Sequence, residues 1–145
     1  MKYLLDSNIV SEPVKAKPDP AVVAWLDSHE TECAVSTITL AELRYGIERL
    51  PEGKRRRQLE RDFAFFRQDL GSRVVAFDEA EAAEWGRYAA TLEQKLGRDA
   101  MRKVGIKDSQ IAATALAHRL TVVTRNTDHF PQVDTLNPFS AEQPV

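Results

Sequence analysis

Residues 106–130 read IKDSQIAATALAHRLTVVTRNTDHF, and this stretch decides the fold that the sequence predicts. Its first half predicts a helix that begins at Asp108, because small and apolar residues recur there at helical spacing. Residues 120–124, LTVVT, form a short and mostly apolar run, as in a strand buried on both faces of a parallel sheet. In such a sheet, the helix before a strand begins at the carboxyl edge, and the strand ends at that edge. We therefore expect Asp108 and Asn126 to be neighbours there.

The rest of the chain alternates short apolar runs with longer helical patterns. Apolar runs predict strands at residues 3–5, 33–36, 74–77, 120–124 and, more weakly, 133–136. Helical patterns lie between them, at residues 21–28, 37–50, 54–70 and 79–96. Strands that alternate with helices favour a parallel sheet with right-handed crossovers. We predict an α/β fold with a central parallel sheet of about five strands and helices on both faces.

Two local features of this outline are specific. The helix at 79–96 should bury one apolar stripe, which consists of Ala82, Trp85, Ala89, Leu92 and Leu96. Residues 98–107 should form a loop with four basic residues, which are Arg98, Arg102, Lys103 and Lys107. Because this basic loop leads directly into Asp108, it is suggestive of a track for phosphate groups.

The composition is that of a folded globular chain. Its 145 residues are 43% apolar and 29% charged, which predicts one domain spanning residues 1–145. The net charge of −2 excludes a global basic field, although residues 44–73 carry nine Lys or Arg against five Asp or Glu. That segment is either a solvated helix face or a patch that attracts phosphate. A single cysteine, Cys33, and no long apolar run favour a soluble cytoplasmic protein.

Three acidic residues from separate elements are expected at the carboxyl edge of the sheet. Asp6 follows the first strand, Glu42 lies in the first turns after the second strand, and Asp108 begins the helix described above. Two of them have a simpler explanation. Asp6 could have a purely structural role as the N-cap of a helix. Glu42 could belong to a capping box, because a Thr stands three residues before it. Asn126, with Asp128 close behind, adds a fourth polar position.

Three carboxylates in one place need compensation. At a separation of about 5 Å and an effective dielectric constant near 20, each pair repels by roughly 3 kcal/mol. Either the carboxylates share protons, with raised pKa values, or a divalent cation neutralises them. Oxygen ligands without Cys or a pair of His residues select hard ions, so we expect Mg²⁺, with Mn²⁺ as a substitute. Mg²⁺ held in this way commonly serves phosphoryl chemistry.

Four motifs resemble those of the PIN-domain ribonucleases, in the same order and over essentially the whole chain. They are YLLDSN at 3–8, STITLAEL at 36–43, DSQIAATA at 108–115 and VTRNT at 123–127. The sequence is most similar to the VapC and FitB-like toxins of bacterial type II toxin–antitoxin systems. The resemblance implies a PIN-like fold and a Mg²⁺-dependent endoribonuclease. In that family, metal-activated water hydrolyses RNA phosphodiesters and leaves a 5′-phosphate.

The resemblance also assigns roles to individual residues. Asp6 and Asp108 would be the principal metal ligands, and Glu42 would complete the set or bind through water. Asn126 stands where many PIN domains have Asp, so it would orient a metal-bound water without adding charge. The other matched positions would line the site around the metal or the phosphate, and they are Ser7, Asn8, Thr37 and, with the weakest match, Asp128.

The family further implies partners. A VapB-like antitoxin would cover the site and present a basic side chain to the carboxylates. RNA would be the substrate, and the chain would form a homodimer or a toxin–antitoxin hetero-oligomer. The apolar helices around residues 63–66 and 85–88 are candidate contacts for both protein partners.

Two other functions stay open on the sequence alone. An aspartyl-phosphate phosphatase or receiver-like domain would use Asp6 as a nucleophile beside Mg²⁺. Phosphatases of that type carry a second Asp two places on, where this chain has Asn8. A catalytically inactive PIN module would only bind RNA or a partner, but the intact Asp6, Glu42 and Asp108 argue against it.

Overall fold

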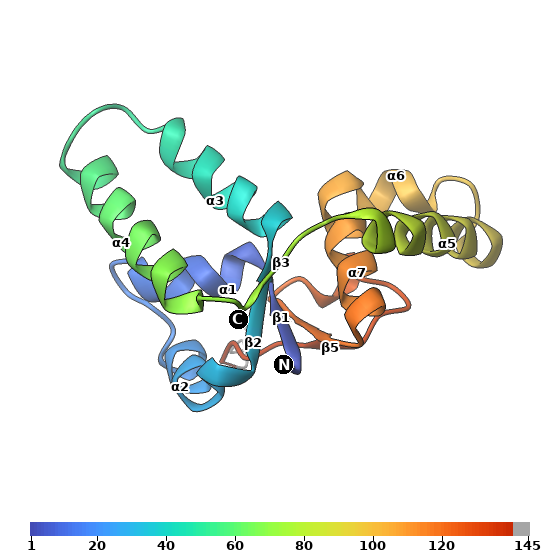
Figure 1. Cartoon of the computed structure of the whole chain (residues 1–145), viewed down its shortest axis with the longest axis horizontal. Helices are drawn as coiled ribbons and strands as arrows, with labels where there is room; N and C mark the ends of the chain where they lie inside the picture. The colour runs from blue at the N-terminus through green and yellow to red at the C-terminus, as the bar shows by residue number, and fades with distance from the viewer. Residues whose placement is uncertain (141–145) are drawn as a thin grey trace, which may run out of the picture.

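The computed structural model describes residues 1–140 and shows a five-stranded parallel sheet (Figure 1). The strand order is β3-β2-β1-β4-β5, and every neighbouring pair is parallel. The strands are β1 (Tyr3–Leu5), β2 (Cys33–Ser36), β3 (Val74–Val75), β4 (Thr121–Val123) and β5 (Thr135–Leu136). The predicted α/β fold with its parallel sheet is therefore confirmed. The third and fifth strands are shorter than expected, and both lie at the edges of the sheet, where only one neighbour pairs with them.

The helices connect these strands. They are α1 (Ser7–Ser11), α2 (Pro20–His29), α3 (Thr37–Glu48), α4 (Lys54–Leu70), α5 (Glu79–Leu96), α6 (Ala100–Val104) and α7 (Ile106–His118). Three short 3₁₀ turns complete the described chain, at Glu12–Val14, Glu30–Glu32 and Thr127–His129. Within residues 1–140, no helix is long and apolar enough to span a membrane.

Helices cover both faces of the sheet because successive strand residues point to opposite sides. In β1, Leu4 packs with residues of α5 and α7, whereas the next residue, Leu5, packs with α1, α2 and α4. In β4, Val122 lies on the same face of the sheet as Leu4, and Val123 lies on the same face as Leu5. All four side chains are almost completely buried. This placement explains why the strands read as apolar runs rather than as alternating ones.

The predicted loop at 98–107 contains a helix. Helix α6 lies between Gly97 and Gly105, whose positive φ angles of 98° and 88° end the neighbouring helical turns. Ala100 is buried against the core, and Met101 and Val104 pack on it. Two adjacent apolar residues and a third one turn later therefore stabilise a helix where the basic residues alone indicated a loop.

Helix α5 buries the middle of the predicted stripe and not its ends. Leu92 is buried, and Trp85 and Ala89 are half-buried, whereas Ala82 and Leu96 are exposed. Glu81 and Tyr88, which the apolar pattern did not select, are buried with Leu92. The polar atoms of the buried residues have partners. Glu81 Oε1 accepts the Asp78 N–H and Oε2 lies 2.8 Å from His118 Nε2, while the Tyr88 hydroxyl donates to Pro131 O at 2.8 Å. Buried polar groups are tolerated when they are hydrogen-bonded, so the apolar pattern alone missed two residues of the buried face and included two exposed ones.

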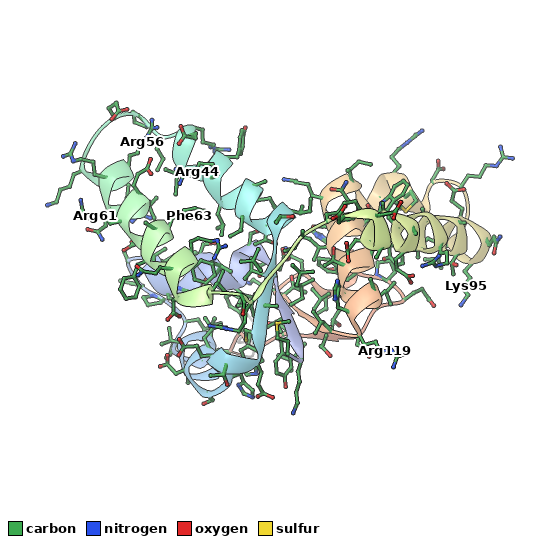
Figure 2. The ribbon with its side chains drawn as sticks, viewed as in Figure 1. Arg44, Arg56, Arg61, Phe63, Lys95 and Arg119 are labelled. Atoms are coloured by element: carbon green, nitrogen blue, oxygen red, sulfur yellow. The ribbon has the colours of Figure 1, made fainter. Side chains whose placement is uncertain are left out.

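Helices α3 and α4 form an antiparallel arm that extends from the sheet on the side opposite α5, α6 and α7 (Figure 1). Ion pairs join the two helices, with Arg44 3.0 Å from Glu60 and Arg56 3.2 Å from Glu48. The Arg44 guanidinium also lies over the Phe63 ring at 4.7 Å, and Figure 2 shows these side chains between the helices. Part of the basic segment at residues 44–73 therefore stabilises the packing of α3 against α4.

Candidate active site

A pocket of about 310 Å³ opens at the carboxyl edge of the sheet. Six of the eight predicted site residues line it, namely Asp6, Ser7, Asn8, Glu42, Asp108 and Asn126. Five further residues complete the lining, namely Val104, Gly105, Ile106, Lys107 and His129. The sheet topology is the cause, because β1, β2 and β4 are adjacent and all end at this edge.

Asp6 occupies the centre of the sheet edge and is only 5% exposed. Its N–H continues the ladder by donating to Val123 O at 2.9 Å. Its carboxylate caps α1 by accepting the Ser7 N–H at 2.8 Å, and it also accepts the Thr124 hydroxyl at 2.8 Å and the Asn8 amide at 3.3 Å. Three donors therefore fix the orientation of this carboxylate, which is both a helix cap and a pocket residue.

Thr124 is a site residue that the sequence interpretation did not single out. It is completely buried, and its hydroxyl donates to Asp6 while accepting the Asn126 N–H at 3.0 Å. The pairing register of the sheet explains why Thr124 lies beside Asp6. Leu5 pairs with Val123, so the residues that follow in each strand, Asp6 and Thr124, face each other.

Glu42 lies on α3, and its side chain is 19% exposed. Its Oε2 is 3.4 Å from Lys107 Nζ, and its Oε1 is buried without a hydrogen-bond partner in the part of the chain that the structure describes. The capping-box explanation is wrong, because Ser36 caps α3 by accepting the Ile38 N–H at 3.0 Å. Burial raises the pKa of Glu42, the negative charges of nearby carboxylates add to the increase, and Lys107 opposes it.

Asp108 stands in the first turn of α7, where the helix dipole favours a negative charge. Its Oδ2 is 3.2 Å from His129 Nδ1. Burial raises the pKa of Asp108, and the charge of Asp6 raises it further, while His129 and Lys107 act in the opposite direction. Asp108 and Asn126 line the same pocket, as the sequence predicted.

Two predicted residues lie outside the pocket. Thr37 is exposed at the start of α3, and its hydroxyl accepts the Phe77 N–H at 3.2 Å, so it joins two chain segments instead of lining the site. Asp128 is exposed within the turn Thr127–His129. That turn brings the next residue, His129, to Asp108 instead. From the sequence, no role is assigned to His129, and Lys107 is named only as part of a basic loop.

The oxygen donors that line the pocket are suited to a hard divalent cation. Among residues 1–140, no group of three or more His, Cys, Asp or Glu side chains is arranged so that it could hold a metal ion. Mg²⁺ needs fewer direct ligands, because it usually keeps several waters and binds through one or two carboxylates. Glu42 Oε1 is a buried acceptor without a donor among residues 1–140. Burial raises the pKa values of Glu42 and Asp108, nearby negative charge raises them further, and a bound cation would relieve this second cause.

A larger groove of about 750 Å³ adjoins the pocket. The two cavities share Ser7, Glu42 and Lys107. Apolar residues of α1, α3 and α4 make up much of the groove wall, including Val10, Leu43, Ile47, Leu59, Phe63 and Phe66. The acidic pocket is therefore continuous with an apolar groove along the α3–α4 arm.

The fold and the site define an α/β protein with carboxylates at the carboxyl edge of a parallel sheet. Comparison with known proteins identifies the family. The chain belongs to the PIN domain family, whose model matches residues 3–136. The predicted resemblance is thus confirmed.

Named relatives extend along nearly the whole chain. It is 38% identical to a protein named VapC ribonuclease Y4jK from Sinorhizobium fredii, over 94% of this chain and 96% of that one. It is also 38% identical to Toxin FitB from Neisseria gonorrhoeae, over 94% and 97% of the two chains. Among solved structures, it resembles one described as FitAB bound to an IR36 DNA fragment, with 36% identity, a TM-score of 0.79 and coverage of 97% and 98%. A VapBC2 complex from Rickettsia felis bound to promoter DNA has 26% identity, a TM-score of 0.74 and coverage of 94% and 98%.

Proposed function

We propose that this protein is a Mg²⁺-dependent endoribonuclease and the toxin of a type II toxin–antitoxin system. The observation that carries the proposal is the convergence of Asp6, Glu42 and Asp108 from three separate elements on one pocket. The 38% identity to a named VapC ribonuclease supports the reaction class. A cytoplasmic location follows from this function, because an RNA substrate is found there.

The residues of the pocket have distinct parts in this reaction. Asp6, held by three donors, would supply a metal ligand of fixed orientation. Glu42 and Asp108, which contact Lys107 and His129, would supply further negative charge. Bound Mg²⁺ would lower the pKa of a coordinated water and screen the charge that develops on the phosphate. Asn126, exposed at the rim, would orient water or phosphate through its amide.

The apolar groove is where we propose that a VapB-like antitoxin binds. An amphipathic helix placed in an apolar groove is a common mode of peptide recognition. The groove reaches Glu42 and Lys107, so a segment lying in it would end at the acidic pocket. The similar structures are described as FitAB and VapBC complexes, which supports a protein partner of this kind. A homodimer stays part of the proposal on the same family grounds.

The receiver-like alternative is not favoured by the topology. Receiver domains such as CheY have the strand order 2-1-3-4-5, whereas this sheet has the order 3-2-1-4-5. A PIN module that binds RNA without cleaving it is compatible with the same fold, so activity has to be measured.

The deciding experiment is a cleavage assay on mixed single-stranded RNA with Mg²⁺ and with EDTA. We expect cleavage only with Mg²⁺, with 5′-phosphate product ends. Asp6→Asn and Asp108→Asn should each lose about a thousandfold or more in rate while remaining folded. Asp128→Asn, the same change at an exposed position outside the pocket, is the matched control and should retain activity. RNA binding without Mg²⁺-dependent cleavage would instead identify a non-catalytic module.

A further inference from the structure

We propose that Lys107 is the phosphate-binding residue of the site, and that it leaves Glu42 for the RNA backbone when the pocket is loaded. The inference rests on the proposed function and names how this pocket holds its substrate. Lys107 is the residue directly before Asp108 and belongs to the first turn of α7, so the helix places its backbone at the pocket.

The contacts of Lys107 make such an exchange feasible. Its Nζ lies 3.4 Å from Glu42 Oε2, at a longer distance than a close ion pair. The Lys107 side chain is 65% exposed, whereas that of Glu42 is 19% exposed. The lysine end of this ion pair is therefore in contact with solvent, and a flexible lysine there can change partners at small cost.

The balance of charge in the pocket indicates why the exchange should occur. Asp6, Glu42 and Asp108 carry three negative charges, and Lys107 carries one positive charge. Counting the three carboxylates and the lysine, two negative charges remain, and one divalent cation balances them. A phosphodiester then brings a further negative charge, and Lys107 is the lysine in the pocket lining that can meet it.

The position of Lys107 agrees with this assignment. Lys107 lines both the acidic pocket and the apolar groove, so it stands where a chain entering from the groove meets the carboxylates. Lys103, four residues earlier and on helix α6, is exposed and outside both cavities. It is therefore a matched control, because it is also an exposed lysine.

The first test measures the affinity of a mixed-sequence single-stranded RNA at several salt concentrations, by fluorescence anisotropy with Mg²⁺ present. All variants carry Asp6→Asn to prevent cleavage. Lys107→Ala should weaken binding about five- to tenfold and reduce the slope of log K against log salt by about 0.7, the value for one phosphate contact on a single strand. Lys107→Arg should keep the slope, and Lys103→Ala should match the parent. Equal slopes for Lys107→Ala and Lys103→Ala would overturn the proposal.

A second measurement concerns the metal, by titration of Mn²⁺ calorimetrically into proteins with an intact Asp6. Removing a cation beside Glu42 should make Lys107→Ala bind Mn²⁺ about two- to tenfold more tightly than wild type. Weaker Mn²⁺ binding would show that Lys107 supports the metal site instead, against the proposal. If wild type cleaves RNA with Mg²⁺ but the Lys107 variants behave like the Lys103 control, only this inference fails. If wild type neither binds nor cleaves RNA, the proposed function fails with it.

Discussion

Thr124 donates a 2.8 Å hydrogen bond to Asp6 Oδ2 inside the protein, although the two residues are 118 positions apart in the chain. Both follow a strand of the sheet, and the pairing of β1 with β4 places them opposite each other. The same hydroxyl accepts the Asn126 N–H at 3.0 Å. One buried threonine therefore orients the central carboxylate and joins it to the loop that carries Asn126.

Replacing Thr124 by Val should remove its hydrogen bonds to Asp6 and to the Asn126 N–H. The two side chains have similar shapes, so the change removes the hydroxyl and leaves a buried carboxylate oxygen with one donor fewer. We expect a loss of about 1–3 kcal/mol in the free energy of unfolding and a fall of roughly 10- to 100-fold in cleavage rate. Urea denaturation and the RNA assay measure the two effects. Thr121→Val in the same strand is the control and should change stability by less than about 0.5 kcal/mol.

The metal-free protein should lose stability as the pH rises through the raised pKa of Glu42. A carboxyl group whose pKa is raised by folding binds more protons in the folded state, so its contribution is largest at low pH and is lost above the raised pKa. Glu42→Gln stays neutral throughout. In EDTA, this variant should melt at a higher temperature than wild type at pH 8, and the two should converge below the ordinary pKa of 4.5. A difference that does not vary with pH would contradict the assignment.

Mg²⁺ should stabilise the folded protein and EDTA should reverse the effect. At a free concentration 100 times the dissociation constant, binding contributes about 2.7 kcal/mol to the free energy of unfolding. The melting temperature should therefore rise with Mg²⁺ in wild type and in Asp128→Asn. Little or no rise is expected in Asp108→Asn, because that variant lacks one of the carboxylates in the pocket. Equal rises in all three proteins would place the binding ion elsewhere.

Helix α5 offers a direct test of its observed orientation. Leu92 is fully buried in the core between the sheet and α7, whereas Leu96, one turn later, is 55% exposed. Leu92→Ala should cost about 2–5 kcal/mol in unfolding free energy, and Leu96→Ala less than about 0.5 kcal/mol. Chemical denaturation of the two variants compares them. Similar costs at both positions would mean that the buried stripe continues to Leu96, as the sequence pattern indicates but the structure does not.

Much of the fold was predictable because its signals are local. The apolar runs at β1, β2 and β4 match the observed strands closely, and α4 spans the predicted residues 54–70. Two segments were predicted less well, for different reasons. At residues 98–107 the basic residues indicated a loop, although Ala100, Met101 and Val104 pack helix α6 on the core. In α5 the apolar pattern missed part of the buried face. Glu81 and Tyr88 are buried because residues distant in sequence, His118 and Pro131, supply their hydrogen-bond partners. A hydrophobicity pattern contains no information about such partners.

The amino-acid sequence alone was sufficient to predict the succession of strands and helices, the parallel sheet, and the meeting of four site residues at one edge. Asp6 and Asn126 follow strands, and Glu42 and Asp108 lie in the first turns of helices that begin at the same edge. Only the tertiary structure decided which neighbours complete the site. Thr124, Lys107 and His129 reach the carboxylates, while Thr37 and Asp128 lie outside the pocket. The physical reason is that periodicity places a residue at an edge or on a face, whereas hydrogen bonds and ion pairs depend on distances of a few ångströms between segments far apart in the chain.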